Sequence, residues 1–575
     1  MGTKGESQCL DAFVIALSQR CEEDEHPSYV STLELHLVSL EFCKACRSIP
    51  TLHVCVEGQT PRSLWDSRRM HPNGPSTCDS ERPFSSRVPV VQALRLTWLL
   101  PLAILLQDAA AELWSKSRVV RLRGSASAPG QKTIIWPRTL KRLVLDTGLE
   151  ISVRAVVWPA SLQSLKFGDA FSQSVTDVVW PASLQRLTFG SSFNQPISKV
   201  VWPAFLQELS FGFCFNQPIA EVAWPISLQK LHLGYHFNQP IAGISGAASL
   251  QELSLGSRFN QPITGVAWPA SLRKLSFGYF FDQPLAEVCW PTSLEHLSFG
   301  KYFNQSITGI RWPTSLHQLS FGLHFDQPVV DVVWPVSLRH LSFGDWFNQP
   351  VVGTVWPSYL KRLSFGGCFN QPIAGVAWPA SLRQLSFGIG FKQPMEAVTW
   401  PVALEQLSFA AEHDHHIADV KWPASLRKQT SGDALSQRLA GVTWPESLRQ
   451  LDLGRGFNQP VDGIVWPPLL QKLTFGSSFN QPIGGAAWPA SLQELAFGML
   501  FNQPIAGVAW PRSLKRLTLG KSFNQPFAKV LWPPSLEELN LGFDVLPFAR
   551  EAVWPVSLTK ITFGGCAQRT VVQAE

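Results

Sequence analysis

The dipeptide Trp-Pro recurs every 22 residues along most of the chain, and this repeat constrains the fold more than any other feature. It runs from Trp136 to Trp554 through twenty registers without an insertion or deletion, and only the register at Gly246-Ala247 lacks it. Nineteen of the 23 Trp residues stand in this one column. A 22-residue unit cannot bury its apolar side chains alone, so the units must stack on their neighbours as a solenoid.

Within one unit the residue pattern predicts a short strand followed by a tight turn. The unit from Trp180 reads WPASLQRLTFGSSFNQPISKVV. Apolar and polar residues alternate over 184–189, which is the period of a strand with one buried face. Gly190 then suits a turn with positive φ or a close backbone approach. We therefore predict a predominantly β repeat solenoid, a leucine-rich-repeat-like stack of about 20 coils with short parallel strands.

Outside the repeat the sequence is less regular. We assign 136–575 to the solenoid and 89–135 to a small helical N-terminal cap, with a helix over Leu102 to Trp114 that begins after Pro101. Residues 1–88 are predicted to be poorly defined or disordered.

An Asn column follows the second Phe of the unit. Asn194 is one member, and Asp282 and Asp326 replace it in two coils. A binding ladder is one interpretation. We favour a structural role, in which the side-chain oxygen accepts from backbone groups of a turn that has no ladder partner.

These residues resemble a known repeat. Leu-x-x-Leu-x-Phe-Gly followed by Phe193-Asn194-Gln195-Pro196 is similar to the FNIP repeat, a member of the leucine-rich-repeat superfamily. The resemblance covers Trp136 to about Cys566. It implies a leucine-rich-repeat-like solenoid that is used for protein contacts, and it implies no catalytic residues.

Motifs for chemistry are weak or absent in this sequence. It holds no phosphate-binding loop, dinucleotide turn, nucleophile elbow or kinase signature, so we predict no enzyme and no cofactor. The run from His413 to His416 and the pair Cys43 and Cys46 could contribute to a metal site, but neither has a second ligand group at motif spacing. We therefore predict no metal.

Charge and hydropathy limit the partners. The net charge is +6 and charged residues make up 16%, so no strong basic field indicates nucleic acid. In the column from Arg186 to Arg362 the signs alternate, which predicts a solvated face without a steering field. The apolar run Leu96 to Leu106 is too short to span a bilayer, so we expect no membrane segment. Scattered cysteines favour reduced thiols and a cytoplasmic monomer.

The candidate binding site is a band of aromatic side chains at the two variable positions after the turn Gly. Other coils have Ser477-Ser478 there, so the repeat does not require the aromatics. They line one edge over roughly seven coils and suit a protein-binding hot spot, although they could also merely pack on adjacent coils. The band consists of Phe213, Tyr235, His236, Tyr279, Phe280, Tyr302, His324 and Trp346.

Three functions follow as hypotheses. The first is a non-enzymatic scaffold that binds a protein partner through the solenoid surface. The second makes Val88 to Trp114 part of an F-box-like segment, so that the solenoid recruits substrates to a ubiquitin ligase. The third is glycan or ice binding by a row of Ser hydroxyls, namely Ser254, Ser276, Ser298, Ser320, Ser342, Ser364, Ser386 and Ser408.

Overall fold

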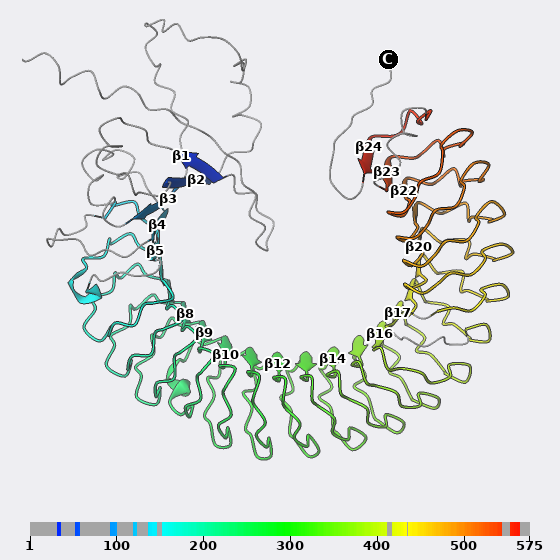
Figure 1. The fold of residues 1–575 in the computed structure, drawn as a ribbon. Coiled ribbons are helices and arrows are strands. Elements are labelled where there is room, and N and C mark those ends of the chain that lie inside the picture. Colours follow the sequence, from blue (N-terminus) through cyan, green and yellow to red (C-terminus); the bar gives the residue numbers. More distant parts are fainter. Residues whose placement is uncertain are drawn as a thin grey trace, which may run out of the picture. The chain divides into compact units, whose positions relative to one another are not determined.

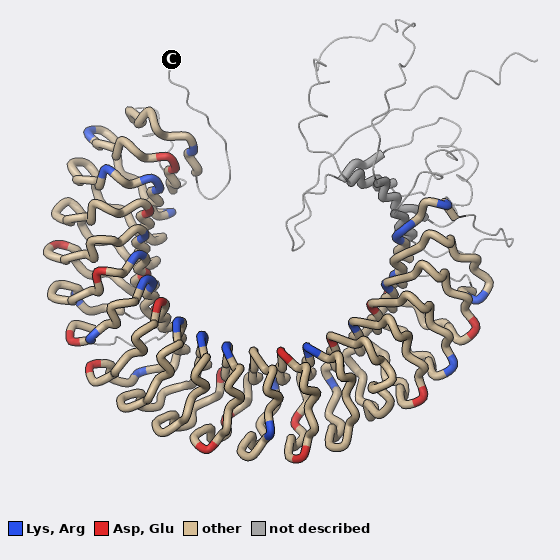
Figure 2. Tube along the Cα trace, turned by 180° about the vertical axis from the view of Figure 1, so that it is seen from behind, with Lys and Arg blue, Asp and Glu red and all other residues tan. Residues whose placement is uncertain are grey.

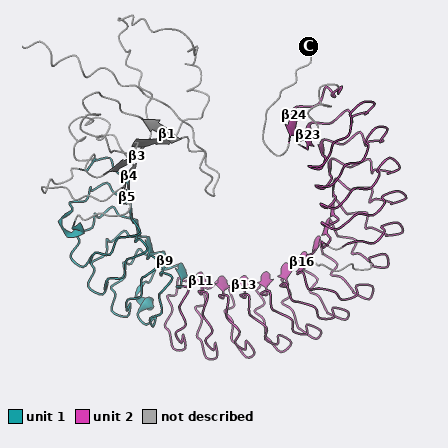
Figure 3. Ribbon diagram, in the orientation of Figure 1, with its two compact units in different colours: residues 1–256 teal, residues 257–575 magenta. Residues whose placement is uncertain are grey.

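The computed structural model describes residues 32–35, 52–57, 93–99, 119–123, 136–145, 152–410, 417–433, 435–542 and 552–563. They belong to two compact units, residues 1–256 and 257–575 (Figure 3). Each is a stack of 22-residue coils with one short strand per coil (Figure 1), so the predicted parallel β-solenoid is confirmed. Helix within the described ranges is limited to two short 3-10 turns, η1 (Val153–Ala155) and η2 (Ile244–Gly246).

The strands of the first unit form one ladder. Strands β1, β2 and β3 pair antiparallel in that order, and each strand from β3 to β10 pairs in parallel with the next along the chain. The strands are β1 (Thr32–Leu35), β2 (Leu52–Glu57), β3 (Ala93–Leu99), β4 (Val119–Arg123), β5 (Arg142–Leu145), β6 (Ser164–Phe167), β7 (Arg186–Thr188), β8 (Glu208–Ser210), β9 (Lys230–His232) and β10 (Glu252–Ser254).

In the second unit every strand pairs in parallel with its successor, and equivalent residues of consecutive coils stand opposite one another. The strands are β11 (Lys274–Ser276), β12 (His296–Ser298), β13 (Gln318–Ser320), β14 (His340–Ser342), β15 (Arg362–Ser364), β16 (Gln384–Phe387), β17 (Gln406–Phe409), β18 (Lys428–Thr430), β19 (Gln450–Asp452), β20 (Lys472–Thr474), β21 (Glu494–Ala496), β22 (Arg516–Thr518), β23 (Glu538–Leu541) and β24 (Lys560–Phe563).

Two predicted N-terminal features fall on residues that are mostly outside the described ranges. Strands β3 and β4 lie within the segment assigned to a helical cap, whereas the predicted helix over Leu102 to Trp114 lies outside the described residues. The F-box-like segment, Val88 to Trp114, also lies outside the described residues except for β3. In the described residues, no helix is both long and apolar enough to cross a bilayer.

The core of a coil is built from the apolar columns of the repeat. In the coil from Trp334 to Val355, the side chains of Leu338, Phe347 and Val351 are completely buried. Trp334 closes the core at the corner and meets the ring of Phe343 edge-on, with centroids 6.3 Å apart. Over much of each unit, equivalent rings stack from coil to coil, and these Phe and Trp columns bury large apolar areas.

Within each unit the coils fan apart away from the strands. Neighbouring strands of a ladder lie about 4.8 Å apart. In the second unit the ring centroids of Phe277 and Phe299 are 5.5 Å apart, those of Phe281 and Phe303 6.1 Å, and those of Trp290 and Trp312 6.4 Å. Because the bulky columns need more room than the backbone ladder, the strands occupy the narrow side of the stack.

The irregular coil from Trp422 keeps its place in the ladder. Strand β18 pairs in register with β17 and β19. Gln429 and Ser431 occupy core positions that hold Leu and Phe elsewhere, and they bond to one another at 3.2 Å. The apolar pattern of the repeat breaks in this coil, but the backbone hydrogen bonds do not depend on side-chain identity, so the strands continue. The histidine run from His413 to His416 lies outside the described residues.

Candidate functional site

The loop that carries the aromatic band is fixed by a close approach between glycines of consecutive coils. A Cβ on Gly344 would lie 1.6 Å from the carbonyl oxygen of Gly322, so no side chain fits. Of the two roles predicted for this Gly column, close approach is the one observed here, because Gly344 has no positive φ. The loops therefore lie directly on one another.

Backbone hydrogen bonds hold these loops in register. The N–H of the second variable residue donates to the carbonyl of the first variable residue one coil earlier. Tyr302 donates to Tyr279 at 2.9 Å, and Trp346 donates to Leu323 at 2.8 Å. Side chains at the second position are therefore neighbours from coil to coil, so large rings there contact one another.

In the second unit these rings form what we call the aromatic ladder: Tyr279, Phe280, Tyr302, His324 and Trp346. Four of them contact one another over consecutive coils. Phe280 stacks on Tyr302 with centroids 5.1 Å apart, whereas the rings are tilted by 30° from Tyr302 to His324 at 4.5 Å and by 47° from His324 to Trp346 at 3.9 Å. Tyr279 and Trp346 remain 54% and 51% exposed. The ladder is thus ordered by internal stacking and still accessible.

A cation lies against the ladder. The Nζ of Lys301 lies 5.4 Å from the ring centroid of Tyr302 and 5.9 Å from that of Tyr279. At an exposed position such a cation–π contact contributes roughly 0.5–1 kcal/mol. Lys301 thus restricts the two Tyr rings further and places a positive charge beside the aromatic ladder.

The first unit contains a smaller group. Phe213 stacks on Tyr235 at 4.5 Å and meets His236 edge-on at 4.7 Å. The coil between the two groups carries Ser257 and Arg258 at the variable positions. The aromatic side chains of the predicted band therefore form two groups, one in each unit.

The Asn column has the structural role that the sequence indicates. The Oδ1 of Asn194 accepts from the backbone N–H of Asn216 at 2.9 Å and from the Gln217 amide at 3.0 Å, and Asp282 acts likewise toward Asn304 and Gln305. The column therefore joins consecutive coils and explains the Gln that follows it.

A second side-chain ladder was not predicted. In most coils a Ser stands three residues after the Trp and donates to the Leu carbonyl of the preceding coil, as Ser337 does to Leu316 at 2.8 Å. Its signal in the sequence is the recurring Ser at this position. Five coils carry another residue there, among them Phe205 and Tyr359, which are 64% and 62% exposed.

The Ser row of the third hypothesis lies along the strands in register, as in Ser342 opposite Ser364. Its members are half-buried. In the described residues no group of three or more His, Cys, Asp or Glu side chains gathers as metal ligands.

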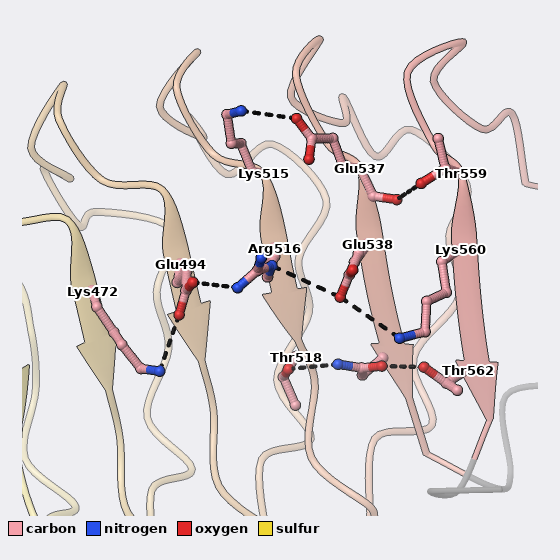
Figure 4. A network of polar contacts seen from close by, with 11 residues as sticks. Lys472, Glu494, Lys515, Arg516, Thr518, Glu537, Glu538, Thr559, Lys560 and Thr562 are labelled. Carbon is pink, nitrogen blue, oxygen red and sulfur yellow. Dashed lines mark hydrogen bonds and ion pairs between the residues drawn. The ribbon is translucent and has the colours of Figure 1, made fainter. Parts of the chain in front are cut away.

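Ionic contacts run across the strand face at the end of the second unit (Figure 4). Lys472 and Arg516 both contact Glu494, at 3.0 and 2.5 Å, and Arg516 and Lys560 flank Glu538 at 3.8 and 3.9 Å. In the first unit Glu208 likewise lies between two cations, Arg186 and Lys230. These exposed pairs contribute little stability each. Positive and negative side chains therefore alternate along the strand face in these two regions.

Comparison with known proteins places the chain in a family. The FNIP Repeat model matches residues 171–214, 215–245, 281–324, 325–368, 457–500 and 501–544. A search of curated proteins found no match. Among solved structures, CroV588, described as a novel circular leucine-rich-repeat protein, is 36% identical over 80% of this chain and 71% of that chain, with a TM-score of 0.64.

A more distant match concerns the fold alone. YopM from Yersinia enterocolitica is 17% identical over 80% of this chain and 94% of its own, with a TM-score of 0.42, so it says nothing about function. The repeat model and the similarity to CroV588 agree with the coil geometry described above. The chain belongs to the FNIP-repeat proteins of the leucine-rich-repeat superfamily.

Proposed function

We propose that the protein is a non-catalytic, monomeric scaffold that binds a partner protein through the aromatic ladder of its second unit. The fold is a leucine-rich-repeat-like solenoid, which is typical of binding scaffolds. The observation that carries the proposal is the accessible row of contacting rings of Phe280, Tyr302, His324 and Trp346, at positions where the repeat itself needs no aromatic residue.

The rings of the aromatic ladder are preorganised for binding. Internal stacking and the backbone ladder already restrict these rings, so little side-chain entropy is lost when a partner covers them. Tyr and Trp also combine large apolar area with a polar group, which makes them frequent hot-spot residues. Phe213 and Tyr235 form a smaller surface of the same kind in the first unit.

We further propose that the protein is located in the cytoplasm. Cys214, Cys289 and Cys368 are exposed free thiols. Exposed thiols of this kind are typical of a reducing compartment.

The test is quantitative affinity capture of binding proteins, followed by mass spectrometry. The variant replaces Tyr302 and Trp346 with Ser. The matched control replaces Tyr359, which is more exposed than either of them but belongs to the corner beside the Trp column. We expect the Tyr302→Ser/Trp346→Ser variant to lose a discrete set of proteins that the Tyr359→Ser control retains. Equal capture by all three proteins, with unchanged circular dichroism, would contradict the proposal.

A further inference from the structure

The strand face of the second unit changes its charge along the stack. Toward its end, cations alternate with Glu494 and Glu538 (Figure 4). Between strands β13 and β16 the corresponding positions hold no acidic residue. Lys and Arg residues follow the strand edge in this part of the unit (Figure 2). We call this stretch the basic strand face; it comprises His317, Arg339, His340, Lys361, Arg362 and Arg383.

The start of each strand presents two side chains outward instead of one. The N–H groups of Arg339 and His340 both donate to the carbonyl of His317, at 2.9 and 3.0 Å. Leu338 and Leu341 on either side are buried, while Arg339 is exposed and His340 is half-buried. The same bend recurs in the next coils, so cations accumulate in two adjacent columns.

Most of this charge is not neutralised. Arg383 pairs with Glu405 at 2.7 Å. Within the described ranges, Arg339, Lys361 and Arg362 take part in no ion pair. The signs of the column from Arg186 to Arg362 therefore alternate in other parts of the chain but not between β13 and β15.

The electrostatic environment of His340 agrees with an excess of positive charge. Its pKa is lowered first by burial and then by the nearby Arg362, with smaller contributions from His296, Lys361 and Arg339.

The positive charge and the spacing of this face fit an extended acidic peptide. Arg339 precedes β14, and Lys361 and Arg362 lie at the start of the neighbouring strand β15, one ladder step of about 4.8 Å away. Two acidic side chains at alternate positions of an extended peptide are about 6.6–6.8 Å apart, so both lie within reach of these three long side chains. The neighbouring Ser row, including Ser342 and Ser364, offers hydroxyl donors for carboxylates. Single-stranded nucleic acid would need aromatic platforms for its bases, and no Phe, Tyr or Trp stands at the outward positions of this face.

We propose that the basic strand face binds an extended acidic segment of a partner protein, with carboxylates at alternate positions contacting Arg339, Lys361 and Arg362. This site is distinct from the aromatic ladder and does not rest on it. It supplies a second contact of defined chemistry on the same unit.

The experiment measures fluorescence anisotropy of a labelled peptide of alternating Glu and Ser, about ten residues long, titrated with the full chain. We expect saturable binding at about 50 mM NaCl that weakens at about 300 mM, because salt screens exposed charges. Lys361→Glu with Arg362→Glu is expected to weaken binding by about tenfold or more. Arg339→Gln with Arg383→Gln removes charge without adding acid and is expected to act in the same direction.

The matched control is Lys472→Glu with Lys560→Glu, which changes the net charge equally on the same strand face where Glu494 and Glu538 already neutralise it. We expect it to change the affinity by less than about twofold. A variant with Tyr302→Ser and Trp346→Ser should bind the peptide as wild type does, which separates this site from the proposed function. Absence of saturable binding, equal losses in the control, or tighter binding of an oligothymidylate of equal length would overturn the inference.

Discussion

The side-chain oxygen of Asn348 accepts a hydrogen bond of 2.8 Å from the backbone N–H of Asn370, one coil further along. It also accepts from the Gln371 amide at 3.1 Å. Since the turns after the strands have no sheet partner, this oxygen replaces the missing ladder acceptor. Consecutive coils are thus joined by side chains in these turns as well as by the backbone ladder of the strands.

Asn348→Ala is expected to lower the free energy of unfolding by about 1–2 kcal/mol, because it leaves the half-buried N–H of Asn370 without an acceptor. Asn348→Asp should stay within about 0.5 kcal/mol of wild type, since Asp326 already serves Asn348 in this way at 2.9 Å. Urea unfolding followed by circular dichroism measures both. An equal loss in the two variants would show that the acceptor oxygen is not what stabilises the turn.

Three glycines should respond differently to Ala. A Cβ on Gly366 would lie 1.9 Å from the carbonyl oxygen of Gly344, so Gly366→Ala forces consecutive coils apart and should cost more than about 3 kcal/mol. Gly375 has open space but a φ of +81°, so its Ala variant should cost about 1–2 kcal/mol. Gly484 has open space and no positive φ, and Gly484→Ala should be neutral or slightly stabilising. Thermal unfolding ranks the three, and any other order would contradict the close-approach argument.

Gln429→Leu is expected to stabilise the protein by about 1–3 kcal/mol. Gln429 is almost completely buried and its Oε1 has no hydrogen-bond donor among the described residues. Leu also restores the residue that other coils carry at this position. Gln450→Leu, at an exposed position of the next strand, is the control and should change stability by less than about 0.5 kcal/mol. A destabilised Gln429→Leu variant in urea unfolding would indicate that the buried amide has a role in this coil.

Arg362→Gln is expected to raise the pKa of His340, because the Arg362 guanidinium is the largest charge effect after burial. Burial remains, so the pKa should stay below its ordinary value. A lowered pKa means that the unfolded chain takes up the proton first, so His340 reduces the stability of the folded state as pH falls through the ordinary histidine pKa. The substitution should weaken this dependence. NMR titration of labelled histidines, assigned with His340→Gln, measures the shift; an unchanged pKa would argue against a positive field at this face.

Much of the architecture could be predicted from the sequence. Trp180, Leu184 and Phe193 recur at a fixed spacing, and no 22-residue unit can bury them alone, so stacking is unavoidable. The structural role of Asn194 also followed, because a turn without a ladder partner needs an acceptor. The strand register of the N-terminal segment could not be predicted, because this segment has no repeat.

The binding surfaces depended on tertiary structure. Phe280, Tyr302 and Trp346 stand 22 residues apart or multiples of it, but only the inter-coil hydrogen bonds show that they stack while staying exposed. The division of the aromatic band into two groups and the unpaired state of Arg339 and Arg362 also required coordinates. The repeat alone determined which residues are buried, because burial in a solenoid follows from position within one unit. Which exposed residues act together was decided by the register of the stack, because it brings distant residues of the chain side by side.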